Sequence, residues 1–102
     1  MRYIETFHEG NHISDIYLCK TKQIQLTKTG KEYGNLILQD KTGTIEAKIW
    51  DLSSPGVGEF DAMDYVHIEA DVTLFQNANQ LNVRRIRTAR EGEYVEADYL
   101  PV

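Results

Sequence analysis

The sequence predicts an all-β protein folded as one small five-stranded barrel. Three observations lead to this prediction: apolar and polar residues alternate along several segments, short polar turns separate those segments, and only one connection is long. With 102 residues, the chain is long enough to enclose one hydrophobic core and too short for two. A hydrophobic content of 41% also excludes an intrinsically disordered chain.

The expected strands are the segments that alternate, because successive residues of a strand face opposite sides of a sheet. These strands cover residues 13–27, 34–39, 44–50, 65–74 and 80–86. In the last of them, Ile86 falls out of phase with Leu81 and Val83. This change of phase predicts a β-bulge near Arg84 and Arg85.

The connections between the strands define the topology. Short turns with Gly or Asn join strands one and two, two and three, and four and five. The long connection runs from Asp51 to Asp64, and its Ser and Pro residues suit the start of one short helix over Val57–Met63. A five-stranded Greek-key barrel with one short helix between strands three and four is an OB-fold. An SH3-like barrel is the main structural alternative, although its long loop would come earlier in the chain.

We expect residues 1–90 to form the OB-fold domain and the acidic residues 91–102 to be a linker or tail. No apolar run approaches the roughly 20 residues of a membrane span, and the first residues lack the apolar core of a secretion signal. The single Cys allows no internal disulfide. A cytoplasmic protein is the simplest interpretation.

The charges are unevenly distributed. The formal net charge is −5, which by itself argues against a nucleic-acid partner. Residues 16–50, however, hold six Lys against three acidic residues, and residues 80–90 hold four Arg and no acidic residue. Residues 51–73 hold six acidic residues and no basic one. This separation allows one positive face, while a mixed, solubilising surface is the alternative interpretation.

The outward positions of strands two and three carry aromatic and apolar residues beside Lys, which suits a surface that binds single strands. Bases stack on aromatic rings, and Lys or Arg neutralises the phosphates. OB-folds commonly bind on this face together with the loops between strands one and two and strands four and five. The candidate nucleic-acid-binding residues on these elements and the outward side of strand five are Lys28, Lys31, Tyr33, Ile37, Lys48, Trp50, Phe75, Asn77 and Arg84.

Each of these residues also has a structural interpretation. Trp50 ends its strand and would equally fit under the 51–64 connection, because Trp is usually largely buried. Ile37 would fit against a neighbouring domain or subunit. Tyr33 would equally serve as a side chain that packs within the adjacent turn. Exposed Lys residues in turns, such as Lys28 and Lys31, are usually only solvated.

No catalytic constellation is evident. His8 and His12 have a spacing that suits a metal on a helix, but Gly10 lies between them and no further ligand completes a set. Cys19 lies in an apolar strand and is interpreted as a core residue. We therefore expect this chain not to be an enzyme by itself, and we expect it to hold no metal or cofactor.

The stretch from Leu36 to Asp51, with its central Asp40-Lys41-Thr42-Gly43, closely resembles the N-terminal OB domain of the YhaM family. These proteins are bacterial 3′→5′ exoribonucleases, also called CMP-binding factors, within the broader tRNA-anticodon-binding type of OB-fold. The similarity continues at the level of pattern over 10–13, 27–31 and 82–87. Asn35 stands where anticodon-binding domains commonly carry a stacking Phe, which favours generic single-strand binding over anticodon recognition.

The resemblance implies a role in holding substrate. Members of the family pair this domain with an HD phosphohydrolase domain, which uses a divalent metal to cleave RNA or single-stranded DNA from the 3′ end. The chain has no HD motif, so we expect an excised domain or a stand-alone relative. The expected partners are single-stranded RNA or DNA, an HD domain on the C-terminal side, or other subunits. The alternative hypothesis is a protein-interaction domain that uses the same face for interdomain or subunit docking.

Overall fold

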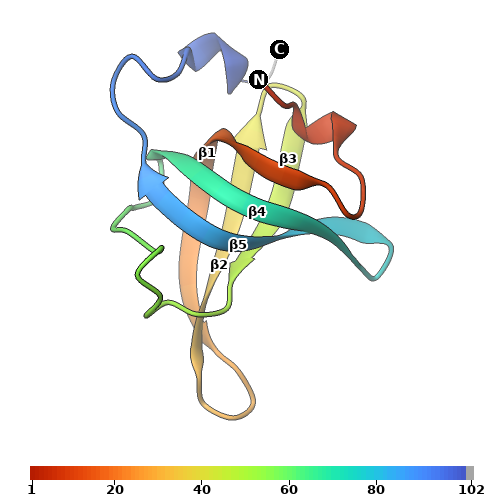
Figure 1. Ribbon diagram of the computed structural model, residues 1–102, viewed down its shortest axis with the longest axis vertical. Helices are drawn as coiled ribbons and strands as arrows, with labels where there is room; N and C mark the ends of the chain where they lie inside the picture. Colours follow the sequence, from red (N-terminus) through yellow and green to blue (C-terminus); the bar gives the residue numbers. More distant parts are fainter. Residues whose placement is uncertain (101–102) are drawn as a thin grey trace.

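The structure is a computed structural model that describes residues 1–100, and it forms a closed barrel of five strands (Figure 1). The strands are β1 (His12–Leu26), β2 (Glu32–Asp40), β3 (Gly43–Ile49), β4 (Tyr65–Phe75) and β5 (Ala78–Thr88). Their order around the barrel is β1-β2-β3-β5-β4. Neighbouring strands are antiparallel except β3 and β5, whose short parallel contact closes the barrel. The predicted OB-fold barrel is thus confirmed.

The inward side chains of all five strands form one core. The alternation read from the sequence assigns them correctly, since Leu36, Leu38, Ala47 and Ile68 are fully buried. Leu74 differs: the alternation of the expected strand 65–74 puts it on the inward side with Ile68, but it is 49% exposed. Leu74 pairs with Asn79 of β5, beyond Asp71, the last residue of β4 that pairs with β1. The β4–β5 hairpin extends past the barrel there (Figure 1).

The predicted bulge in β5 is present. Glu69 of β4 pairs with Arg85, whereas the next residue, Ala70, pairs with Val83, so Arg84 is the extra residue on β5. A bulge of this kind shifts the phase of the side chains beyond it. Here the shift returns Ile86 to the core, where it is 2% exposed.

The predicted helix between strands three and four is absent, so that part of the prediction was wrong. Residues 51–64 form a series of turns instead. Their backbone groups bond to β5: Gly58 N–H donates to Ile86 O (2.8 Å), and Ile86 N–H donates to Gly56 O (3.0 Å). The two Gly residues permit this close approach and disfavour a helix. Phe60, 5% exposed, covers the barrel core in place of a helix.

The acidic C-terminal segment lies against the barrel over its described part, residues 91–100. It includes the 3₁₀ turn η2 (Glu96–Asp98). The ring of Tyr94 stacks on Tyr65 of β4 at a centroid distance of 4.1 Å, and Tyr99 is 2% exposed. Gln39 Nε2 of β2 donates to the Tyr99 carbonyl at 3.0 Å. Tyr94 and Tyr99 thus hold part of the expected linker or tail against the barrel. The domain limit at residue 90 stays a prediction.

The N-terminal residues close the same end of the barrel. They form the 3₁₀ turn η1 (Ile4–Thr6), which places Ile4 and Phe7 in the core. Asp40 at the end of β2 is 1% exposed and accepts hydrogen bonds from the backbone N–H groups of Ile4 and Thr42, each at 2.7 Å. The first residues and the described C-terminal segment therefore lie at one end of the barrel, and the loop between β1 and β2 projects from the other (Figure 1).

No helix among residues 1–100 is long and apolar enough to cross a membrane.

Candidate nucleic-acid interface

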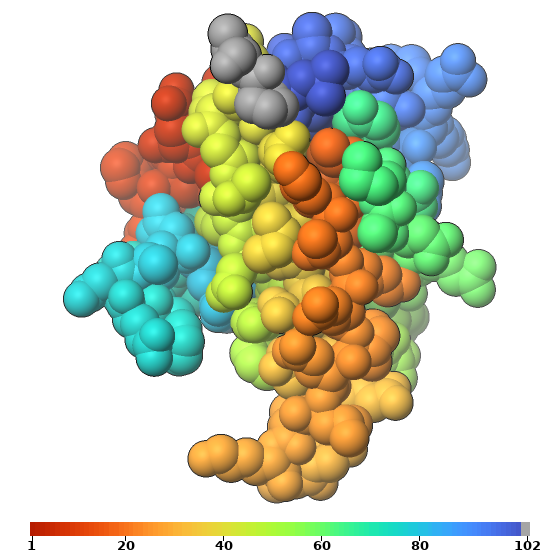
Figure 2. All heavy atoms as spheres, turned by 180° about the vertical axis from the view of Figure 1, so that it is seen from behind, coloured from red at the N-terminus to blue at the C-terminus, as the bar shows by residue number. Residues whose placement is uncertain are grey.

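A groove of about 540 Å³ crosses the outer face of the barrel at β3 and β5. Figure 2 shows the recess between two projections, the β1–β2 loop region in orange and the β4–β5 hairpin in cyan. The residues that line this groove are Tyr33, Glu46, Lys48, Trp50, Phe75, Gln76, Ala78 and Gln80.

Two aromatic side chains form one end of the groove. The rings of Tyr33 and Trp50 lie 5.0 Å apart, with 31° between their planes. Tyr33 Oη donates to Gln25 Oε1 (2.8 Å), and Trp50 Nε1–H donates to Asn82 Oδ1 (3.1 Å). Trp50 is 46% exposed, so it does not fold under the 51–64 connection, which was the alternative interpretation. These bonds hold two ring faces on the surface, where a base can stack.

Lys48 supplies the positive charge beside these rings. Its Nζ lies 5.6 Å from the Tyr33 ring centroid and donates to Asn35 Oδ1 at 2.8 Å. Both contacts follow from the register, because Asn35 of β2 pairs with Lys48 of β3. The side chain is half-buried and held in one position, so its ammonium is preorganised rather than freely mobile.

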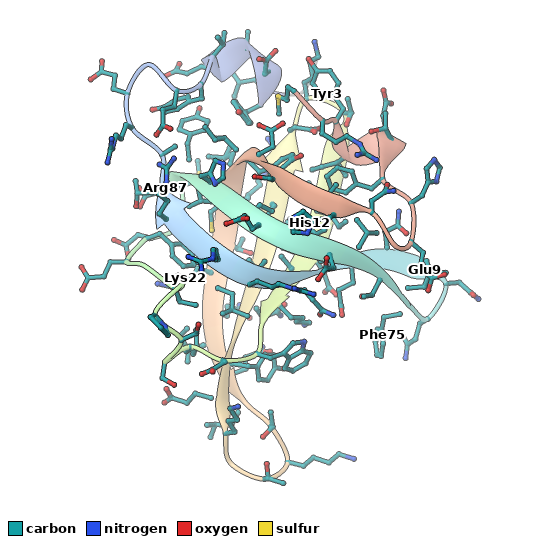
Figure 3. All side chains as sticks on the ribbon, in the orientation of Figure 1. Tyr3, Glu9, His12, Lys22, Phe75 and Arg87 are labelled. Carbon is teal, nitrogen blue, oxygen red and sulfur yellow. The ribbon has the colours of Figure 1, made fainter. Side chains whose placement is uncertain are left out.

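The β4–β5 hairpin forms the other end. Phe75 is 56% exposed and points out from the hairpin (Figure 3). Gln76 and Asn77 form the two-residue turn, with φ angles of 52° and 65°. Positive φ at both positions matches the type I′ turn that suits a hairpin. The turn thereby fixes an exposed aromatic ring opposite the Tyr33–Trp50 pair.

The structure therefore brings four of the predicted residues together in the groove: Tyr33, Lys48, Trp50 and Phe75. The other predicted residues lie around it: Lys28 and Lys31 exposed on the β1–β2 loop, Ile37 half-buried on β2, Asn77 at the hairpin tip, and Arg84 on β5.

Arg84 lies beside Trp50 and Asn82, in a smaller depression of about 390 Å³ next to the groove. Its Nη2 is 2.6 Å from Asp71 Oδ2, and His12 Nδ1 is 3.1 Å from Asp71 Oδ1. The hydrogen bond with His12, followed by the charge of Arg84, lowers the pKa of Asp71 below its ordinary value. Arg84 thus carries a charge that is already partly neutralised by a carboxylate.

Sequence reasoning missed Glu46 and Gln80. Alternation placed Glu46 on the outer face of β3, but an acidic residue was not expected in a surface for phosphates. Gln80 Nε2 donates to Glu46 Oε2 at 3.3 Å, and the two residues are partners in the parallel β3–β5 contact. No local pattern in the sequence indicates that pairing, because it is made when the barrel closes.

The described part of the chain, residues 1–100, contains no group of three or more His, Cys, Asp or Glu side chains that could hold a metal ion. Cys19 is fully buried, and burial raises the pKa of its thiol to about 11. The thiol therefore stays protonated and packs as a core residue, as the sequence predicted.

Comparisons with known proteins agree with this architecture. The chain is 36% identical to the "3'-5' exoribonuclease YhaM" of Bacillus velezensis over 92 residues, which are 89% of this chain and 29% of that protein. It is 33% identical to the protein of the same name from Bacillus pumilus over 95 residues, 93% of this chain and 30% of that protein. The chain thus spans less than a third of the length of these curated relatives. No family model matches it.

Solved structures show the same fold at low identity. The HINb domain of p204 aligns with a TM-score of 0.65 at 17% identity, over 85% of this chain and 44% of that one. A replication protein A heterotrimer bound to ssDNA aligns with a TM-score of 0.61 at 18% identity, over 86% of this chain and 64% of that one. The second OB-fold domain of replication protein A from Methanococcus maripaludis aligns with a TM-score of 0.57 at 18% identity, over 89% of this chain and 96% of that one. Sequence and structure together identify the chain as an OB-fold domain homologous to a part of the YhaM exoribonucleases.

Proposed function

We propose that this domain binds single-stranded RNA or DNA in the groove across β3 and β5. The observation that carries the proposal is the arrangement of two exposed aromatic surfaces, the Tyr33–Trp50 pair and Phe75, on either side of Lys48. Stacking on such rings is worth about 1–3 kcal/mol per base and tolerates any sequence. The replication protein A heterotrimer, which shares the fold, was solved bound to ssDNA.

The electrostatics favour modest affinity. Lys48 is the basic residue inside the groove, and Lys28, Lys31 and Arg84 lie on the elements beside it. Each phosphate neutralised on a single strand adds about 0.7 to the slope of log K against log salt. With few such contacts and a net charge of −5, the domain binds locally and with a shallow salt slope.

We further propose that the domain holds substrate for a 3′→5′ exoribonuclease, the activity for which its relatives are named. The hydrolysis and its divalent metal would belong to an HD domain of the same protein, while the OB-fold domain would contribute binding without cofactor. The partners of this chain are then a single-stranded nucleic acid and that catalytic domain, in the cytoplasm.

The direct test follows the fluorescence of Trp50, the single Trp of the chain, during titration with short RNA and DNA oligonucleotides at low salt. Quenching that saturates, with NMR shift changes confined to β2, β3 and the β4–β5 hairpin, is the expected result. Unchanged fluorescence and an unchanged NMR spectrum would overturn the proposal.

Matched variants separate the groove from the rest of the surface. Phe75→Ala is expected to weaken oligonucleotide binding about tenfold. Leu74→Ala changes a neighbour of similar exposure and is expected to leave binding unchanged. Trp50→Ala, followed by the anisotropy of a labelled oligonucleotide, is also expected to weaken binding. If Trp50→Ala alters only self-association or docking to a catalytic domain, the groove is a protein interface instead.

A further inference from the structure

An acidic side chain lies in the middle of a groove that we propose for a polyanion. Glu46 is exposed on β3, lines the groove, and accepts a hydrogen bond from Gln80. None of the ion pairs among residues 1–100 includes Glu46, so its charge is not neutralised by Lys48. A free carboxylate repels phosphates, and phosphate binding therefore does not explain its position.

The register places Glu46 between the two aromatic surfaces. Along the outer face of β3, Glu46 comes two residues before Lys48, which itself comes two residues before Trp50. Across the β3–β5 contact Glu46 pairs with Gln80, and Gln80 is two residues from Ala78, the partner of Phe75. Two residues of a strand span about 6.6 Å, close to the width of a base. A base that stacks on Phe75 thus directs its edge towards the Glu46–Gln80 pair.

The chemistry of this pair distinguishes the four bases. A carboxylate only accepts hydrogen bonds, and its two oxygens suit a donor group with two parallel N–H bonds. The Watson–Crick edge of guanine offers that arrangement through N1–H and N2–H. Cytosine and adenine offer one amino group beside an acceptor, so one carboxylate oxygen finds a donor while the base acceptor faces the other. Uracil and thymine place a single N–H between two carbonyl oxygens, which face the carboxylate unfavourably.

We propose that Glu46 is a specificity-determining residue that selects guanine and disfavours uracil or thymine at the base position next to Phe75. This inference rests on the proposed single-strand binding. The expected order of affinity is guanine first, cytosine and adenine next, and uracil or thymine last. Single-stranded bases are commonly read through this edge when they stack on aromatic side chains, and a good bidentate contact corresponds to about tenfold discrimination.

The test uses five-nucleotide RNAs, UUGUU, UUCUU, UUAUU and UUUUU, and the DNA series with thymine, all at one low salt concentration. A single guanine in a pyrimidine background avoids self-association of guanine runs. For the unaltered protein we expect UUGUU to bind about tenfold more tightly than UUUUU. The RNA and DNA series are expected to give the same order, because the contact involves only the base.

Glu46→Gln removes the acceptor-only carboxylate and keeps the size of the side chain. We expect it to remove the preference for UUGUU and to strengthen binding of UUUUU, because a repulsive charge is lost. Glu32 is exposed at the start of β2 and does not line the groove. Glu32→Gln makes the same change of charge there, and it should keep the preference for UUGUU. Equal affinity of the unaltered protein for all four RNAs, or a preference that survives in Glu46→Gln, overturns this inference alone. Absence of binding to every oligonucleotide overturns the proposed function as well.

Discussion

The rings of Tyr33 and Trp50 pack at 5.0 Å although they come from different segments of the chain. Gly34 of β2 pairs with Ile49 of β3. Tyr33 precedes Gly34 and Trp50 follows Ile49, so this register sets the two rings side by side. A Cβ added to Gly34 would lie 3.3 Å from Ile49 Cβ and Leu52 Cδ2, so this close approach suits glycine. The pair is thus fixed by backbone pairing before any ligand arrives.

Removal of one ring from this pair tests whether it stacks on bases. Tyr33→Ala is expected to lower the affinity for a single-stranded oligonucleotide about tenfold, because the stacking surface is lost while the core is untouched. Tyr33→Phe keeps the ring and loses only the hydrogen bond to Gln25, so it should bind nearly as the unaltered protein does. Fluorescence anisotropy of a labelled oligonucleotide measures both. Equal losses in the two variants would assign the effect to the hydroxyl group.

The salt dependence of binding tests the role of Lys48. Lys48→Ala is expected to reduce the slope of log K against log salt by about 0.7, because one phosphate contact is lost. Lys41→Ala is the matched control, since Lys41 lies on the β2–β3 turn, with its Nζ 4.9 Å from the Tyr3 ring centroid, at the other end of the barrel. An identical reduction in both variants would show that only net charge matters.

The effect of one Gly→Ala substitution on the free energy of unfolding tests the structure of the 51–64 segment. In this structure, a Cβ on Gly56 would lie 2.9 Å from Arg85 Cγ and 3.0 Å from Arg84 O. We therefore expect Gly56→Ala to lower the free energy of unfolding by about 1 kcal/mol or more, measured by urea denaturation. Stabilisation by this change would contradict the close contact between this segment and β5.

Two leucines on the strands give opposite expectations for stability. Leu38→Ala empties a fully buried position and is expected to lower the free energy of unfolding by about 3 kcal/mol. Leu74→Ala changes a side chain that is 49% exposed on the hairpin, and its effect should stay below about 1 kcal/mol. Urea unfolding of the two variants against the parent measures the contrast. Similar losses would contradict the exposure of the hairpin.

Low pH is expected to loosen the C-terminal segment. Arg87 donates two hydrogen bonds of 2.9 Å to Glu93, and with the Arg90 backbone N–H it lowers the pKa of Glu93 to about 2 from an ordinary 4.5. A carboxyl whose pKa is lowered on folding stabilises the folded state fully above its unfolded pKa. That contribution is therefore lost as the pH falls from about 4.5 towards 2.

NMR of the Arg90 amide and the Tyr94 ring between pH 5 and 2 measures this change. Asp71 also has a lowered pKa and titrates at acidic pH, so a control is needed. Glu93→Gln should abolish the step at Arg90 and leave the step near Asp71 in place. A step at Arg90 that persists in Glu93→Gln would show that another group controls the segment.

The sequence by itself determined the five strands, their inward residues other than Leu74, and the bulge at Arg84. Each of these depends on a local property, the alternation of side chains every two residues. The same property predicted that Tyr33, Lys48 and Trp50 would face outward. The resemblance to the YhaM family was also recognised in the sequence, and the identity to the YhaM relatives confirms it.

Only the tertiary structure decided which outward residues meet. The parallel contact of β3 with β5 brings Glu46 to Gln80, and the hairpin sets Phe75 across from Trp50. Closure of a barrel joins residues that are distant in sequence, and alternation carries no information about such pairing. The irregular 51–64 segment has the same origin, because backbone groups of Gly56 and Gly58 bond to β5 and those of Met63 and Asp64 bond to β1, while its internal bonds close only single turns. The composition of the groove, with one lysine and one carboxylate between two aromatic surfaces, is therefore a property of the closed barrel.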